Sequence, residues 1–294
     1  MKHYGDIGND EMRIINSTEG ERKPPLYRRW WFWVALAVAL IVVIAVVVWP
    51  SQSTAEMMPE EYMDSMELYP ESMPQSIAVA QSLELSGPAS VQVEDTTIND
   101  VPLRLYTPVN ATPELFLGLP DTNNSNLLLA FRAADIRADN WQIVGAFVMK
   151  GELLSRGMSK KGFCAIIDGT LHLGLAESTP LLEEAIEKEG YFFRQYPLVS
   201  DGKMIENKPK GKAVRNALCD IDGRTVAVRS LSQESFHDFA QALADLGVQH
   251  AVYLSGSTSY GFCRADQSSF SSWGEIPKGK ELENTNFIVW KSVR

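Results

Sequence analysis

A continuous apolar run near the N-terminus places the strongest constraint on how this chain folds. Residues 30–49 read WWFWVALAVALIVVIAVVVW, with no charged residue, glycine or proline. A helix over this run rises about 1.5 Å per residue, so it spans the roughly 30 Å hydrocarbon core of a bilayer and satisfies its own backbone hydrogen bonds there. Tryptophan at both ends is typical of membrane interfaces. The run therefore predicts one transmembrane helix, bounded by Trp30 and Trp49.

A cleaved signal peptide is the competing interpretation of this run. Its apolar region would be shorter, and a small-residue cleavage site would follow it. Here Trp49-Pro50 closes the run, and residues 53–55 (STA) make only a weak cleavage site. We therefore interpret residues 30–49 as an uncleaved signal-anchor.

The charges beside the anchor predict its orientation. Residues 22–29 contain four basic side chains, whereas residues 51–75 contain six acidic side chains and no basic one. Because basic residues stay on the cytoplasmic side, we expect a single-pass protein of the cell membrane with a cytoplasmic N-terminus. Composition then divides the chain into a cytoplasmic tail (1–29), the transmembrane helix (30–49), an acidic flexible stalk (50–75) and an exported domain (76–294), periplasmic or extracellular.

Charge and cysteine content limit the ligands of the chain. The net charge is −10, and no basic face of the kind that contacts nucleic acid is apparent. Cys164, Cys219 and Cys263 leave open either one disulfide with a leftover thiol or three buried thiols. No Cys-x-x-Cys pair or histidine cluster suggests zinc. The sequence therefore requires no metal and no cofactor.

Short strand patterns with turn signals fill much of the exported domain. Residues 143–149 (IVGAFVM) are typical of a buried strand. Asp168-Gly169 and Asp222-Gly223 are dipeptides typical of two-residue type I′ hairpin turns, and each lies between two apolar runs.

Two helices stand between these strands. The first is expected after residues 178–180 (STP), which offer an N-cap and an early proline, and to end at Gly190. The second is expected to begin near Ser232 and to end at Gly247, because its apolar residues recur at helical spacing. Many strands with a few interspersed helices predict an α+β fold with mixed sheets.

An ordered series of segments carries a resemblance to a known family. Matching residues are Gln195, Pro197, Leu198, Val199 and Gly202, then Arg215, Ala217 and Leu218, and finally Leu254, Gly256 and Ser259. In this order and spacing, residues 98–291 resemble the phosphodiester glycosidase family, the domain of N-acetylglucosamine-1-phosphodiester α-N-acetylglucosaminidase, the uncovering enzyme.

Two turns depart from the pattern of that family. Lys150-Gly151-Glu152 stands where the family has an Asn-Gly-Gly-like turn, and Leu254-Ser255-Gly256-Ser257 stands where it has Leu-Asp-Gly-Gly. Ser255 thus replaces an acidic residue. Glycoside cleavage usually rests on two positioned carboxylates, so this replacement leaves open whether the domain is an active enzyme.

The resemblance implies a hydrolase that cleaves sugar 1-phosphodiesters of glycans or envelope polysaccharide. Arg215 would hold the phosphate, Glu152 would supply an alternative carboxylate, and Ser255 would stand at the signature turn. The residues expected to bind the sugar are Gln195, Asn216, Gly256, Ser257, Thr258 and Ser259. The expected partners are the membrane and a glycan or sugar-phosphate ligand.

Plainer interpretations of the same residues remain open. Arg215 is equally typical of a salt-bridged structural residue, and residues 255–259 of an ordinary polar turn. The alternative function is a catalytically inactive pseudoenzyme of the same fold that binds an envelope glycan or a partner protein.

Overall fold

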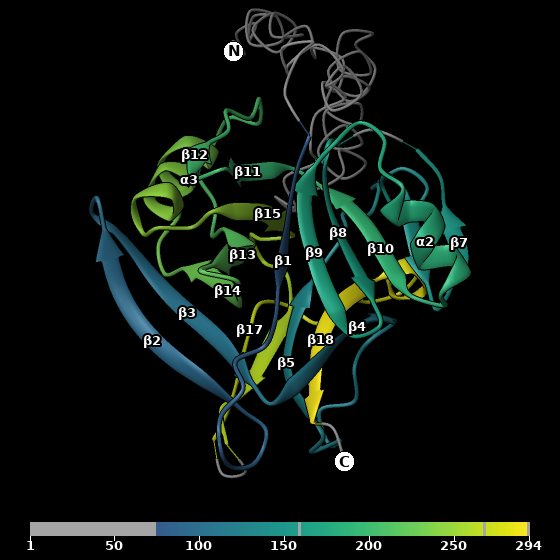
Figure 1. Cartoon of the computed structure of the whole chain (residues 1–294), viewed down its shortest axis with the longest axis horizontal. Helices are drawn as coiled ribbons and strands as arrows, with labels where there is room; N and C mark the ends of the chain where they lie inside the picture. The colour runs from purple at the N-terminus through teal and green to yellow at the C-terminus, as the bar shows by residue number, and fades with distance from the viewer. Residues whose placement is uncertain (1–74, 158–159, 267–268, 293–294) are drawn as a thin grey trace, which may run out of the picture. The chain divides into compact units, whose positions relative to one another are not determined.

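The computed structural model describes residues 75–157, 160–266 and 269–292 (Figure 1). The predicted tail, transmembrane helix and stalk, including Trp30 and Trp49, lie outside these residues. Within the described ranges, no helix is both long enough and apolar enough to cross a bilayer.

Three antiparallel sheets make up the described domain. Sheet A has the order β1 (Ser76–Ala80), β9 (Thr170–Leu175), β8 (Gly162–Ile167), β10 (Tyr191–Gln195), β6 (Phe147–Met149) and β7 (Glu152–Ser155). Sheet B has the order β12 (Lys203–Met204), β11 (Pro197–Ser200), β15 (His250–Leu254), β13 (Asn216–Ile221), β14 (Arg224–Ser230), β3 (Val101–Val109) and β2 (Ser90–Ile98). Sheet C has the order β17 (Phe270–Trp273), β16 (Gly261–Arg264), β5 (Leu127–Arg132), β18 (Asn286–Ser292) and β4 (Ala111–Leu117).

The predicted α+β class is wrong, because the described domain is mostly β. Its helices are short, α2 (Leu181–Glu187), α3 (Phe236–Asp245) and α4 (Glu281–Asn284). The helix signals themselves marked real elements, but they cover far fewer residues than the strands. Strands with polar sequences, such as β2, carry no apolar run that would have revealed them.

The two Asp-Gly turns are confirmed, and both predicted helices are present with shifted ends. Asp168 and Gly169 both adopt positive φ between β8 and β9, as do Asp222 and Gly223 between β13 and β14, which is the backbone of a type I′ turn. Helix α2 has Pro180 as its N-cap, without a side-chain cap hydrogen bond, and Lys188 as its C-cap. Helix α3 begins later than predicted. Its cap is Ser235, whose hydroxyl accepts a hydrogen bond from the Asp238 N–H at 3.0 Å.

The central strands are buried on both faces. Every residue of β5 (LLLAFR), β8 (GFCAII) and β15 (HAVYL) is buried. One apolar cluster takes side chains from all three sheets, among them Phe131, Phe193 and Leu254. The ends of these central strands therefore meet inside the domain, away from bulk water.

A polar cluster links β1 of sheet A to sheet B. Ser76 Oγ lies 2.7 Å from His250 Nε2 and donates to Asp201 Oδ1 at 2.6 Å. His250 is 8% exposed, and its Nδ1 lies 3.8 Å from Asp220 Oδ2. Since β1 is an edge strand of sheet A, these contacts attach its first residue to sheet B, in addition to its pairing with β9 and the backbone hydrogen bonds of Gln81 to Gly223 and Thr225.

The first prediction concerns this attachment. His250→Ala removes one of the two side chains that contact Ser76 from sheet B, the other being Asp201. Hydrogen exchange of the β1 amides should become about fivefold faster, as expected for the loss of roughly 1 kcal/mol of hydrogen bonding. Amide exchange followed by mass spectrometry measures this. His237→Ala is the control, because His237 is exposed on α3 and pairs with Glu206. Equal β1 exchange in both variants would contradict the attachment.

Candidate functional site

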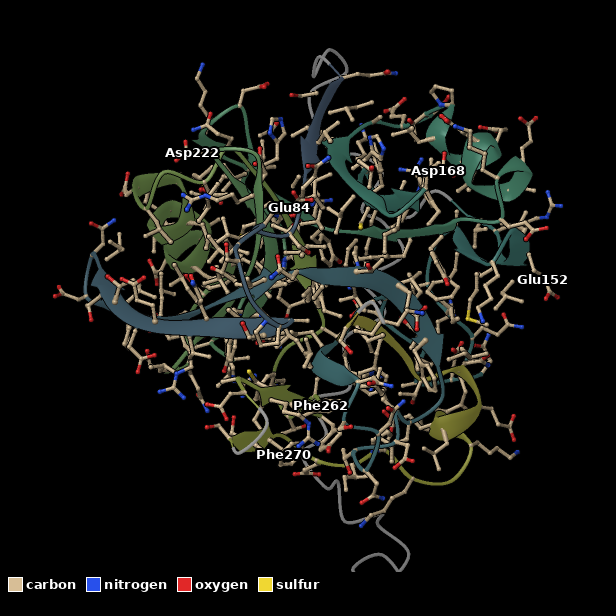
Figure 2. The ribbon with its side chains drawn as sticks, turned by 60° about the horizontal axis from the view of Figure 1, so that its bottom comes forward. Glu84, Glu152, Asp168, Asp222, Phe262 and Phe270 are labelled. Atoms are coloured by element: carbon tan, nitrogen blue, oxygen red, sulfur yellow. The ribbon has the colours of Figure 1, made fainter. Side chains whose placement is uncertain are left out.

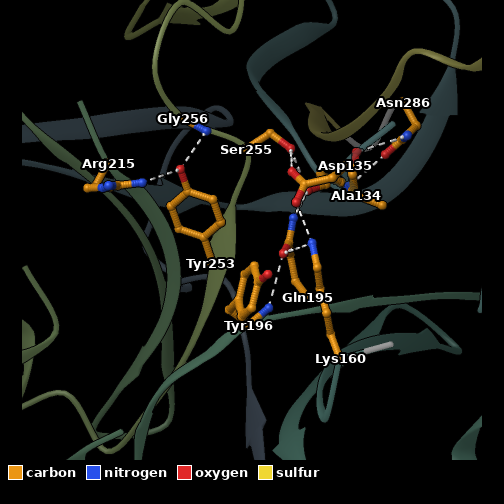
Figure 3. Close-up of polar contacts among 11 residues, drawn as sticks. Ala134, Asp135, Lys160, Gln195, Tyr196, Arg215, Tyr253, Ser255, Gly256 and Asn286 are labelled. Atoms are coloured by element: carbon orange, nitrogen blue, oxygen red, sulfur yellow. Dashed lines mark hydrogen bonds and ion pairs between the residues drawn. The ribbon is translucent and has the colours of Figure 1, made fainter. Parts of the chain in front are cut away.

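Four polar side chains meet where the ends of central strands from the three sheets come together (Figure 3). Asp135 follows β5 of sheet C and Ser255 follows β15 of sheet B. Lys160 precedes β8, and Gln195 ends β10, both in sheet A. We call these four residues the junction cluster.

A buried ion pair is the centre of the junction cluster. The Lys160 ammonium pairs with Asp135 Oδ2, and the side chains are 2% and 13% exposed. Ser255 Oγ donates to Asp135 Oδ1 at 2.6 Å. Lys160 Nζ also donates to Gln195 Oε1 at 2.8 Å and lies 4.4 Å from the centre of the Tyr196 ring. The Asp135 carboxylate thus forms an ion pair with one oxygen and accepts a hydroxyl hydrogen bond with the other.

The environment keeps Asp135 ionised. Burial acts to raise the pKa of Asp135, but the Lys160 charge and hydrogen bonds from Lys160, Ser255 and Gln195 overcome it and lower that pKa below its usual value. Burial lowers the pKa of Lys160, and Asp135 opposes that shift. Asp135 is therefore ionised at neutral pH, and Lys160 gives up its proton more readily than an exposed lysine.

Backbone contacts fix the position of Asp135. Asn286 is fully buried and holds Ala134 from both sides, since its Oδ1 accepts from the Ala134 N–H at 2.7 Å and its Nδ2 donates to the Ala134 carbonyl at 3.2 Å. Gln195 Nε2 donates to the Ala133 carbonyl at 3.3 Å. Residues 133–135 are thus held by side chains from β18 and β10.

The signature turn follows β15 directly and packs against β13. Asn216 Nδ2 donates to the Ser255 carbonyl at 2.9 Å, and the Gly256 N–H donates to the Tyr253 hydroxyl at 3.1 Å. Ser257 and Thr258 are exposed, and Ser259 is half-buried. Of the residues predicted from the sequence, the structure therefore brings Gln195, Asn216, Ser255 and the turn to one place.

Arg215 lies next to that turn, and its guanidinium contacts other groups of the protein. It donates to the carbonyls of Glu234 and Gly211 at 2.9 and 2.8 Å, lies 3.5 Å from the Tyr253 hydroxyl, and packs 4.2 Å from the Phe236 ring centre. Its predicted phosphate contact stays a prediction, and most of its donors are already used.

Glu152 lies apart from the junction cluster. It is exposed on the edge strand β7 and points outward at the periphery in Figure 2. Its register partner Met149 faces Tyr191, at the opposite end of β10 from Gln195. Four residues along a strand and two strand spacings correspond to about 13 Å and about 10 Å. The structure thus does not bring Glu152 to Ser255.

Two members of the junction cluster were not predicted from the sequence. Asp135 lies in a segment with no recognised motif, 120 residues from Ser255. Lys160 stands just before the strand that leads into the predicted Asp168-Gly169 turn. One available signal was an acidic residue three positions after the buried strand β5, since such a strand ends in the interior. The Ser255 hydroxyl thus has a carboxylate partner, Asp135.

All three cysteines are free and buried, so the structure selects the unpaired alternative. Burial raises the pKa of Cys263 to about 12, so this thiol stays protonated at neutral pH and is a poor nucleophile. The described ranges also contain no group of three His, Cys, Asp or Glu side chains arranged for a metal ion.

Comparison with known proteins bears on the fold. No family model and no curated protein matches this chain. Among solved structures, it is similar to the catalytic domain of zebrafish N-acetylglucosamine-1-phosphodiester alpha-N-acetylglucosaminidase, auto-inhibited by its pro-peptide, with a TM-score of 0.51 and 13% identity over 76% of this chain and 89% of that chain. A hypothetical protein from Synechocystis gives a TM-score of 0.45 and 13% identity over 69% of this chain and 62% of that one. The chain therefore shares its fold, at remote sequence distance, with the catalytic domain of a phosphodiester glycosidase.

Proposed function

We propose that residues 76–294 form a phosphodiester glycosidase-like hydrolase that cleaves sugar 1-phosphodiesters of glycans or envelope polysaccharide at the junction cluster. The observation that carries this proposal is the 2.6 Å hydrogen bond between Ser255 and Asp135. It delivers a carboxylate to the turn where the resembled family carries its acidic residue. The shared fold with a sugar phosphodiester glycosidase is consistent with the same reaction class.

A single carboxylate suits this substrate better than it suits an ordinary glycoside. Ordinary glycosides need a second carboxyl group to protonate a poor alkoxide leaving group. The leaving group here is a phosphate monoester, whose second pKa is about 6, so it departs as a dianion without protonation. One carboxylate is then enough to activate the attacking water.

The proposed step uses groups of this chain. Asp135 accepts a proton from water as the water oxygen bonds to the anomeric carbon, and the bond from that carbon to the phosphate oxygen breaks. Asp135 then returns the proton to solvent. Lys160 holds the carboxylate ionised before the step, and Ser255 fixes its orientation.

The membrane anchor predicted from the sequence forms a second part of the proposal. Residues 30–49 would anchor the chain as a single-pass protein with a cytoplasmic N-terminus, and the acidic stalk 50–75 would carry the exported domain. Random-coil scaling gives such a stalk a reach of roughly 25–30 Å. That reach would keep the site near membrane-proximal glycans.

A second candidate function is the pseudoenzyme that binds a glycan or partner protein without cleaving it. The favouring observation is that Asp135 is 13% exposed and already paired with Lys160 and Ser255. A water molecule would have to reach Asp135 beside these partners.

The second prediction separates these two functions. Full-length protein is incubated with sugar 1-phosphodiesters, including the methyl diester of N-acetylglucosamine 1-phosphate, and free sugar is measured. Asp135→Asn should reduce the rate at least about hundredfold, the typical contribution of a positioned base. Asp168→Asn is the matched control, because Asp168 is exposed and Asn-Gly suits the same type I′ turn. Binding of a diester without any release of sugar from the wild-type protein would favour the pseudoenzyme.

A further inference from the structure

One arginine beside the junction cluster lacks a counter-charge. The guanidinium of Arg229, on β14, donates to Asn216 Oδ1 at 3.0 Å and lies 5.2 Å from the centre of the Trp273 ring. It forms no ion pair with any described residue. Burial lowers its pKa, and the nearby Tyr106 and Tyr253 oppose that shift. A desolvated cation without an anion is costly, so such a group is a candidate to bind one.

The neighbouring arginines are already occupied. Arg104 faces Arg229 across the strands β3 and β14 and binds Asp95 with two hydrogen bonds, at 2.6 and 2.7 Å. Arg215 donates to backbone carbonyls, as described above. Arg229, by contrast, is half-buried, and none of its nitrogen atoms is both fully buried and without a hydrogen-bond partner. The donor atoms that Asn216 does not occupy are therefore open to solvent.

Three hydrogen bonds connect Arg229 to the proposed catalytic carboxylate. Asn216 accepts from Arg229 and donates to the Ser255 carbonyl at 2.9 Å, and Ser255 Oγ donates to Asp135. Directly opposite residues on neighbouring strands share a face of the sheet, so Arg104 and Arg229 lie on one face. A hollow of about 140 Å³ opens beside Arg104, Tyr106 and the exposed Phe270, which is labelled in Figure 2, and Arg229 is not among its lining residues.

We propose that Arg229 is the anion-binding residue of this site and takes the phosphodiester group of the ligand. The ligand class rests on the proposed function. A diester carries one negative charge, which the guanidinium of Arg229 balances, and two oxygens that a guanidinium can contact together. The Trp273 ring and Asn216 hold the guanidinium in place before the ligand arrives. The sequence resemblance assigns this contact to Arg215 instead.

The third prediction tests this assignment by calorimetry on the full-length protein. The probes are the methyl diester of N-acetylglucosamine 1-phosphate, dimethyl phosphate and neutral methyl N-acetylglucosaminide. Arg229→Gln should weaken binding of the sugar diester about tenfold to hundredfold, the range of charge-assisted hydrogen bonds, and leave the neutral glycoside unchanged. Arg224→Gln, at the exposed start of the same strand, should leave both unchanged.

Each outcome decides the proposal. Unchanged diester affinity in folded Arg229→Gln overturns it, as does the absence of diester binding by the wild-type protein. Dimethyl phosphate that binds as tightly as the sugar diester overturns the ligand class. If Arg229→Gln does not fold, Arg229→Lys decides, because an ammonium cannot contact two oxygens in the same planar geometry. It should bind the diester about three- to tenfold more weakly, and unchanged affinity overturns the assignment.

The two proposals fail in different ways. Arg229-dependent binding without release of sugar keeps the anion site and removes the hydrolase. Release of sugar with unchanged binding in Arg229→Gln keeps the hydrolase and removes the anion site.

Discussion

Lys160→Met is expected to lower the free energy of unfolding by about 3–5 kcal/mol, because it leaves the Asp135 carboxylate largely buried without its counter-charge. Lys160 is 2% exposed, so water cannot replace it. Urea denaturation followed by circular dichroism measures the change. Lys212→Met is the control, since the Lys212 side chain is 62% exposed and its ion pairs are long.

A double variant shows whether the cost comes from the orphaned charge. Asp135→Leu combined with Lys160→Met removes both charges, and replacing a buried pair by apolar residues is often neutral. The double variant should therefore be more stable than Lys160→Met alone. If the double variant is less stable by the sum of the two single losses, the pair is not energetically coupled.

The pH dependence of the stability of these variants follows from the direction in which folding shifts the pKa of Asp135. The pKa of Asp135 is lowered in the folded state, so its contribution is fully present above the unfolded pKa of about 3.9 and is lost as the pH falls through the lower folded value. In Lys160→Met, burial without the ammonium raises the pKa of Asp135, and protonation then favours folding. The difference in stability between wild type and variant should be largest above the raised pKa of Asp135 in the variant. It should shrink as the pH falls through that pKa toward about 4, and shrink further below about 4 as the wild type loses its own contribution.

Local features of the fold were predictable because they depend on neighbouring residues. Asp168-Gly169 and Asp222-Gly223 adopt positive φ whatever packs around them. Gly247 ends α3 with a φ of 96° for the same reason. The proportions of strand and helix, and with them the fold class, could not be predicted from such local signals. The polar strand β2 is held by its nine-residue ladder to β3, which no local pattern reveals.

The junction cluster shows the same limit at the functional site. Ser255 and Gln195 could be found because they stand in ordered motifs. Asp135 could not, because its partner Lys160 is 25 residues away and Ser255 is 120 residues away. An acidic residue after an apolar strand is a local signal, but it does not say which side chains the residue will meet. Only the packing of the three sheets brings these strand ends together.

Gly256→Ala should destabilise the domain by about 3 kcal/mol, at the upper end of overpacking costs. A Cβ at this position would lie 2.3 Å from the Val214 carbonyl oxygen and 2.6 Å from the Tyr253 hydroxyl. The carbonyl cannot move away cheaply, since it also accepts the Ser257 N–H at 2.7 Å. Because neither partner is the end of a flexible side chain, the turn itself must shift.

The displaced turn links this variant to function. Ser255 precedes Gly256 and holds Asp135 at 2.6 Å, so a shift of a few tenths of an ångström weakens the orientation of the carboxylate. We therefore expect Gly256→Ala to lose sugar release as well as stability, measured at a temperature where the variant is still folded.

The control variant is Gly279→Ala, which introduces backbone strain but no close contact. Gly279 has a φ of 62°, and a methyl group added there would meet nothing within 4 Å, so this variant should cost only about 1–2 kcal/mol. Equal losses in the two variants would mean that the turn has room for a side chain and that a glycine at position 256 is not what positions Ser255.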